Sequence, residues 1–136
     1  PNAGFSPPGV QTWLPVNPNY AQGVNVADEL TNPGSLLHFY RRLLRVRRQT
    51  PALIAGDYMP LHEEAQEYLA FLRSSPEDQQ TCLVVLNMSD QAHTLTFDLP
   101  RSTARVLFSS RLRESATDNL RRLLIAPFEV YVAELT

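Results

Sequence analysis

Three pairs of neighbouring acidic residues are the first groups in this sequence that could do chemistry: Asp28-Glu29, Glu63-Glu64 and Glu77-Asp78. Two carboxyl groups can act as acid and base only when they face each other across the bond that reacts. Each pair here is adjacent in the chain and lies among polar residues, without a Gly-rich or apolar cradle around it. We therefore expect solvated loop carboxylates and no catalytic residue.

The histidines, the cysteine and the serines give no better site. His38, His62 and His93 lack the close His or Cys spacing that is typical of metal ligands. The one cysteine, Cys82, lies in an apolar run and is predicted to be a small buried hydrophobic residue. Ser109-Ser110 lacks the glycines of a nucleophile elbow. The sequence therefore predicts no metal, no cofactor and no nucleophilic centre.

The composition is that of an ordinary globular protein, with 43% hydrophobic residues, 19% charged residues and a net charge of −2. This near-neutral charge argues against nucleic acid as a partner, so the arginines gathered between Arg41 and Arg48 are expected to form a solvated face. No segment is long and apolar enough to span a membrane, and no signal-peptide pattern is visible. We expect a cytoplasmic protein with no membrane partner.

One amphipathic helix is predicted over residues 33–48. Asn32 precedes Pro33, which is typical of an N-cap followed by proline at the first helical position. Thr50 precedes Pro51 and is expected to end the helix, because the residue before proline resists the helical region. At helical spacing the segment carries an apolar stripe whose main members are Leu36, Phe39, Tyr40 and Leu43.

From Pro51 onward the pattern changes to short strands separated by polar breaks. The predicted strands cover residues 57–61, 67–73, 81–88, 94–99, 105–109, 121–125 and 128–135, with a turn at Asp118-Asn119. Short strands at such close spacing favour an antiparallel sandwich or barrel. The aromatic residues inside these strands are predicted to lie in the core: Phe71, Phe97, Phe108, Phe128 and Tyr131.

The first 34 residues do not fit a self-sufficient β domain. They hold six of the eleven prolines, four of the five glycines and the only tryptophan, and they show no helical or strand period. They also carry too much apolar surface for a solvated linker. We therefore expect a loop that rests on a surface this chain does not contain.

This loop holds an ordered series of motifs: Asn-Ala-Gly-Phe at 2–5, Trp-Leu-Pro-Val-Asn-Pro-Asn-Tyr at 13–20 and Val-Asn-Val at 24–26. The series closely resembles the end of the catalytic barrel in the α-amylase superfamily of glycoside hydrolases. The resemblance is best to its α-glucosidase, oligo-1,6-glucosidase and trehalose synthase branch. Residues 35–43 and 47–53 are similar to that family's eighth barrel helix and its exit. Residues 83–89 and 127–129 are similar to landmarks of its C-terminal β-sandwich.

The resemblance implies a fold and a division of the chain. Residues 1–52 would be the last loop and eighth helix of a (β/α)8 barrel, and residues 53–136 a Greek-key-like antiparallel β-sandwich. The family's two catalytic aspartates and its acid/base glutamate lie upstream of the first motif and have no counterpart here. The chain is thus expected to be a non-catalytic C-terminal fragment of an enzyme that acts on α-glucosidic bonds of oligosaccharides. Its role would be structural, capping the barrel.

The resemblance also implies a site and partners. Asn2, Phe5 and Trp13 would help to shape a substrate-entrance loop. The partners would be the missing catalytic barrel and an oligosaccharide at the loop edge. Without the barrel strands, the apolar stripe of the helix is expected to fold back on the sandwich or to associate with another copy of the chain. Two alternatives stay open from the residues alone: a stand-alone carbohydrate-binding module that uses exposed aromatics, and a protein-interaction module that docks through the stripe.

Overall fold

The computed structural model describes residues 6–136. The chain divides into two compact units, and the boundary between Arg42 and Leu43 falls inside helix α2 (Leu36–Gln49). The first unit is mostly irregular and contains the short 3-10 helix η2 (Pro18–Gln22) and the one-and-a-half-turn helix α1 (Val26–Thr31). Asparagine side chains begin both, because Asn17 Oδ1 accepts from the Asn19 amide at 3.1 Å and Asn25 Oδ1 from the Asp28 amide at 2.9 Å.

Helix α2 begins three residues later than the sequence predicts, so the N-cap at Asn32 was wrong. Asn32 is the C-cap of α1, and its side-chain oxygen accepts from the Gly34 amide at 3.0 Å, which forms a local turn. Ser35 takes the capping position, with its hydroxyl 3.3 Å from the His38 amide. The predicted end is confirmed: α2 stops at Gln49, and Pro51 starts the separate helix α3 (Pro51–Ala55).

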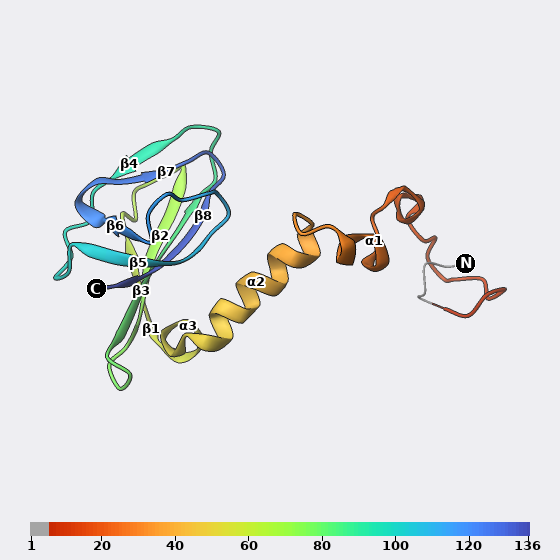
Figure 1. The fold of residues 1–136 in the computed structure, drawn as a ribbon, viewed down its shortest axis with the longest axis horizontal. Helices are drawn as coiled ribbons and strands as arrows, with labels where there is room; N and C mark the ends of the chain where they lie inside the picture. Colours follow the sequence, from red (N-terminus) through yellow and green to blue (C-terminus); the bar gives the residue numbers. More distant parts are fainter. Residues whose placement is uncertain (1–5) are drawn as a thin grey trace. The chain divides into compact units, whose positions relative to one another are not determined.

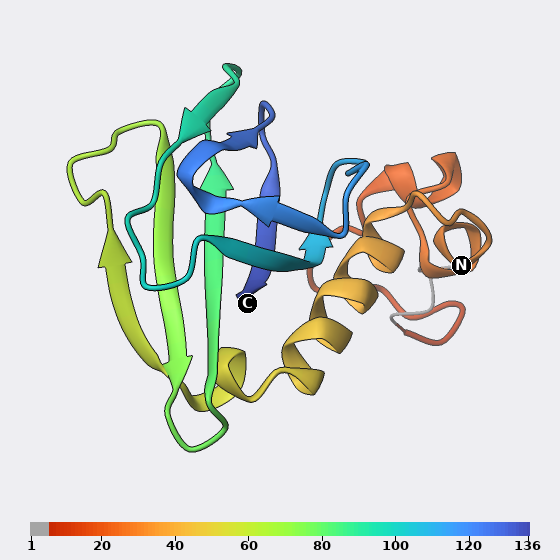
Figure 2. The ribbon, with the colours of Figure 1, turned by 60° about the vertical axis from the view of Figure 1, so that its left-hand side comes forward.

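The second unit is an antiparallel β structure in two layers (Figure 1). The large sheet has the order β1-β2-β3-β8-β5-β6, and a small sheet pairs β4 with β7. Figure 2 shows β1, β2 and β3, coloured yellow-green to green, side by side in the large sheet. The strand bounds are β1 Asp57–Leu61, β2 Tyr68–Ser75, β3 Gln80–Asn87, β4 His93–Leu95, β5 Thr103–Ser109, β6 Thr117–Asn119, β7 Leu123–Ile125 and β8 Val130–Leu135. The 3-10 helix η3 (Leu120–Arg122) leads into β7.

The connections confirm the Greek-key-like sandwich. The chain leaves the large sheet after β3 for β4, returns as β5, crosses again to β7, and closes with β8 between β3 and β5. The core lies between the two sheets and against the segment that follows β4. Its buried members are Ala70, Leu72, Leu83, Val85, Leu95, Phe97, Ala104, Leu120, Leu123, Ile125, Tyr131, Ala133 and Leu135.

Several local expectations were wrong. The predicted strand 94–99 is a strand only as β4, residues 121 and 122 belong to η3, and Phe71 is half-buried on the face of β2 opposite the core. Asp118-Asn119 belongs to strand β6, which pairs with β5, and is not a turn. Phe128 lies before β8 with a φ of 53° and a 59% exposed side chain, so it is not a core residue. Residues 126–129 turn the chain back into the large sheet, and Phe128 takes the left-handed conformation within this reversal.

Candidate functional site

Trp13 is the one member of the predicted entrance loop that the described residues include, since Asn2 and Phe5 lie outside them. Its side chain is 95% exposed, in an irregular segment that precedes η2. The nearby Asn25 amide donates to the Tyr20 carbonyl at 2.8 Å, which fixes the end of this loop to the start of α1. The structure therefore presents Trp13 at the surface of the first unit.

The prediction of solvated loop carboxylates is confirmed for two acidic pairs and was wrong for Asp28-Glu29, which lies in α1. Asp28 accepts from the Asn25 amide group at 2.6 Å, and Glu29 Oε2 accepts from the Leu37 backbone amide at 2.9 Å, at the start of α2. A carboxylate at this position satisfies an orphan amide of the first helical turn. Glu63, Glu64 and the Glu77-Asp78 pair are exposed in loops.

One buried carboxylate was missed by the sequence analysis. Glu129 is only 2% exposed, and its Oε1 accepts from the Ser109 hydroxyl at 2.6 Å and from Arg113 Nε at 2.9 Å. Its Oε2 accepts from the Ala126 amide at 2.8 Å. The one signal in the sequence was a single acid within the apolar run 128–133.

Arg113 extends this network to a second carboxylate. Its Nη1 lies 3.1 Å from Asp118 Oδ2, which also accepts from the Tyr131 hydroxyl at 3.1 Å, and its guanidinium lies 4.4 Å above the Tyr131 ring. The pKa of the Tyr131 hydroxyl is raised above its ordinary value. Burial is the largest cause, and the neighbouring Asp118 charge adds to it. Both Glu129 oxygens are paired and buried, and the network connects β5, β6 and β8.

The histidines pack separately. His38 Nε2 lies 3.0 Å from the Leu30 carbonyl, His62 stacks on Phe97 with ring centroids 4.7 Å apart, and His93 Nε2 lies 2.9 Å from the Ser89 hydroxyl. Among residues 6–136, no group of three or more His, Cys, Asp or Glu side chains is placed to hold a metal ion.

Apolar residues also cover the second face of the large sheet. Successive strand residues point to opposite faces, so Leu83 and Val85 of β3 point into the core while Cys82, Val84 and Leu86 point away from it. We define the outer apolar face by the residues on that side, taken from the strand register: Tyr58, Leu69, Phe71, Val84, Leu86, Phe108, Val130 and Val132.

The outer apolar face is partly buried and partly open. Val84, Val132 and Phe108 are at most 8% exposed, whereas Tyr58 is 54% and Leu69 39% exposed. The Tyr58 and Phe71 rings pack against each other with centroids 5.1 Å apart. A strand that is buried on both faces has hydrophobic residues at successive positions. This explains the continuous apolar run in β3. Such a face can exclude water against another protein surface, but it offers no groups for catalysis.

The outer face becomes polar beside helix α3. Gln80 Oε1 accepts from the Ala52 amide at 3.1 Å, and its Nε2 donates to Glu134 Oε1 at 3.1 Å. Glu134 also pairs with Arg105 across the sheet. Cys82 lies beneath this cluster and is fully buried, as predicted. Burial, and then the Glu134 charge, raise the pKa of the Cys82 thiol to about 12.

Within residues 6–136, α2 is the longest helix, and neither it nor any other is long and apolar enough to cross a membrane.

Comparison with known proteins places the two parts of the chain. Residues 1–56 match the family model of the alpha amylase catalytic domain, and residues 58–132 match that of the maltogenic amylase C-terminal domain. The glucan 1,6-alpha-glucosidase of Streptococcus pneumoniae serotype 4 is 32% identical over 134 residues, which are 98% of this chain and 23% of that protein. The oligo-1,6-glucosidase of Parageobacillus thermoglucosidasius is 30% identical over 138 residues, with the same coverage of 98% and 23%.

Solved structures agree. The trehalulose synthase MutB of Pseudomonas mesoacidophila MX-45, as a variant in complex with the substrate sucrose, superposes with a TM-score of 0.83 and 31% identity. The match covers 99% of this chain and 23% of that one. The chain thus spans about a quarter of the length of these two glucosidases. With more than half of its residues in the maltogenic amylase C-terminal domain, this chain belongs to the α-amylase superfamily of glycoside hydrolases, as a C-terminal part of such a protein.

Proposed function

We propose that this chain is the non-catalytic C-terminal part of an enzyme that acts on α-glucosidic bonds of small oligosaccharides. Residues 1–52 would be the last loop and eighth helix of the catalytic barrel, and residues 53–136 would be the domain that caps it. The names of the relatives, a glucan 1,6-alpha-glucosidase and an oligo-1,6-glucosidase, support the substrate class. The pairing of both Glu129 oxygens supports a structural role for the one buried carboxylate of the described residues.

The outer apolar face carries the proposal. A sheet that is apolar on both faces needs cover on both, because each exposed Å² of apolar surface costs roughly 25 cal/mol. The inner face has the small sheet, whereas Tyr58 and Leu69 of the outer face remain open to solvent. We assign this face to the catalytic barrel of the parent protein. Its side chains are apolar, and it has no two carboxylates that face each other as in a catalytic site. Both features suit a permanent domain interface.

The first unit would contribute in two ways. The stripe of α2 would pack on the barrel strands, since Leu36 is 63% and Tyr40 55% exposed in this chain. Trp13, with Asn2 and Phe5, would lie at the substrate entrance, where an oligosaccharide could contact the exposed indole. A cytoplasmic location for the enzyme stays a prediction, supported by a buried thiol as the sole cysteine.

The test compares this chain with the longer protein that the relatives imply. We expect a reading frame upstream of Pro1 to encode the rest of the barrel, and the extended protein to hydrolyse or isomerise isomaltose or sucrose. The isolated 136-residue chain should be inactive on both. Activity of the isolated chain, free of contaminating glucosidase, would contradict the proposal.

Two matched variants of the extended protein test the interface. Leu69→Asp puts a charge on the outer apolar face, and Leu124→Asp puts one on an exposed position of β7, where the side chain is 59% exposed. We expect Leu69→Asp to lower the midpoint of thermal inactivation by several degrees and Leu124→Asp to leave it unchanged. Equal shifts of the inactivation midpoint in the two variants would contradict the assignment of the outer apolar face to the barrel interface.

A further inference from the structure

One arginine lies on the same side of the large sheet as the outer apolar face. Arg73 follows Phe71 by two residues in β2, so both side chains point to that side. The cross-strand partners of Arg73 are Tyr58 of β1 and Cys82 of β3. The sheet thus places a cation beside an exposed aromatic ring, at the margin of the outer apolar face.

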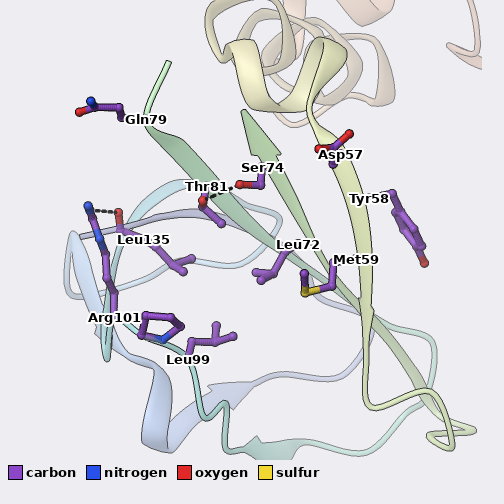
Figure 3. Close-up of a pocket in the computed structure, with 11 residues that line it drawn as sticks. Asp57, Tyr58, Met59, Leu72, Ser74, Gln79, Thr81, Leu99, Arg101 and Leu135 are labelled. Carbon is purple, nitrogen blue, oxygen red and sulfur yellow. Dashed lines mark hydrogen bonds between the residues drawn. The ribbon is translucent and has the colours of Figure 1, made fainter. Parts of the chain in front are cut away.

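The acid that is next to Arg73 in the strand register lies on the other side of the sheet. Asp57 precedes Tyr58, and it lines a hollow of about 490 Å³ on the inner side. Figure 3 shows Met59 and Leu72 next to each other on that inner side, while Tyr58 lies on the opposite side of β1. The sheet therefore separates Asp57 from Arg73.

The next acid on the outer side is already paired. Glu134 of β8 lies in the same cross-strand row as Arg73, two strands away. It forms an ion pair with Arg105 and accepts from Gln80 Nε2 at 3.1 Å. Among residues 6–136, no side chain forms a hydrogen bond or an ion pair with the Arg73 guanidinium, whose Nε is buried.

Arg113 shows what a half-buried arginine of this fold normally has around it. Of the twelve arginines, all of which the structure describes, only Arg73 and Arg113 are half-buried, and the others are exposed. Arg113 pairs with Asp118 and Glu129 and donates to the Leu124 carbonyl. Such partners compensate for the water that a buried charge loses. Arg73 has lost part of its water without gaining them.

Docking of the barrel would make this cost larger. The proposed function places the barrel on the outer apolar face, which includes Tyr58, the cross-strand neighbour of Arg73. A surface that covers the Tyr58 ring also displaces water from the guanidinium beside it. An apolar surface would leave a bare cation in the interface, whereas a carboxylate can accept two N–H groups of the arginine fork.

We propose that the barrel presents an acidic side chain, aspartate or glutamate, to Arg73. The inference rests on the proposed function, because the barrel is the partner there. It adds the chemistry of the contact, which is an apolar surface with one carboxylate at the margin that faces β2. Such a charge pair fixes how the two domains are oriented, since an apolar face alone does not specify one orientation.

The test compares Arg73→Met in the isolated chain and in the extended protein. Methionine keeps an aliphatic side chain and removes the charge. In the isolated chain we expect the thermal midpoint to stay or to rise, because an unpaired charge is lost. In the extended protein we expect it to fall by about 2 °C or more, because the barrel carboxylate loses its partner. Arg122→Met, at an exposed position, is the control and should leave both midpoints unchanged.

Two further measurements apply if the extended protein does not fold with Arg73→Met. Arg73→Lys keeps the charge but not the planar fork, so its midpoint should fall by less than about 2 °C below that of the wild type. A crystal structure of the extended protein should show a barrel carboxylate within about 4 Å of the Arg73 guanidinium. Only water or backbone carbonyls at that place would overturn the inference.

Other results would also overturn it. A similar fall of the midpoint in both proteins would show that Arg73 acts through its own packing. Self-association of the isolated chain that Arg73→Met weakens would place the acid on a second copy. If Leu69→Asp destabilises the extended protein and Arg73→Met does not, the acidic contact fails but the outer apolar face stays the interface. If neither variant destabilises it, the proposed interface fails as well. None of these readouts depends on enzymatic activity.

Discussion

Glu129 differs from the exposed acids of this chain in that every oxygen of its carboxylate is already bound. It receives a hydroxyl from β5, a guanidinium from the loop after β5 and a backbone amide from the turn before β8. Arg113 and Glu129 are sixteen residues apart and meet only because β5 pairs with β8. The sequence shows the acid but not its partners, which is why the acid was not singled out.

The first prediction concerns this carboxylate. Glu129→Ala takes the acceptor from the Ser109 hydroxyl and the Ala126 amide, while Arg113 keeps Asp118 as its counter-charge. Because buried donors are left unpaired, the free energy of unfolding should fall by about 1–3 kcal/mol. Urea denaturation followed by circular dichroism measures the loss. Glu64→Ala, at an exposed loop position, is the control and should change stability by less than about 0.5 kcal/mol. If both variants lost a similar amount of unfolding free energy, the hydrogen-bond network of Glu129 would not contribute to stability.

The buried thiol gives a prediction about pH. The pKa of Cys82 is about 12 in the folded chain and 9.0 as its ordinary value, which we take for the unfolded chain. Above pH 9 the unfolded state releases this proton while the folded state keeps it, so rising pH favours unfolding. The wild type should therefore lose more stability between pH 8 and pH 10 than Cys82→Val, which has no proton to release. Parallel pH profiles from urea denaturation would contradict this.

At the scale of elements, strands with strong patterns were predictable and short ones were not. Strand β1 was predicted at its exact bounds and β2 and β3 within two residues, because polar breaks and a long apolar run delimit them. Strand β6 and helix α1 have three and six residues, too few for a period to appear. They are held instead by pairing with β5 and by the Asn25 cap, neither of which a local pattern contains.

The junction between α3 and β1 depends on one glycine. A Cβ atom at Gly56 would lie 2.5 Å from the Ala52 carbonyl oxygen and 2.8 Å from that of Ser74, both of them backbone atoms that cannot move easily. Gly56→Ala should therefore separate α3 from β2 and lower the melting temperature. Gly34→Ala is the matched control, because the nearest atom there is a side-chain oxygen of Asn32 at 3.4 Å. We expect Gly34→Ala to be neutral or slightly stabilising, and equal melting temperatures for the two variants would contradict the steric reason.

At the scale of the whole molecule, both units expose apolar side chains to solvent. The sequence predicted the stripe of α2 and the loop with Trp13 from composition and spacing. It did not predict the outer apolar face, because a strand such as β3 shows only that both its faces are apolar. Which neighbours share each face follows from the order β1-β2-β3-β8-β5-β6, and this order arises from long connections that leave no local signal.

These surfaces lead to a prediction for the isolated chain, which is that it self-associates. Leu36 and Tyr40 of the α2 stripe are more than half exposed, and burying them against a second copy removes apolar area from water. Sedimentation velocity should show a coefficient that rises with protein concentration. Leu36→Asp should weaken this dependence, whereas Leu124→Asp, with a similar exposure on β7, should not, because it lies outside the stripe. A wild-type chain that sediments as a monomer at all concentrations would contradict association through the stripe.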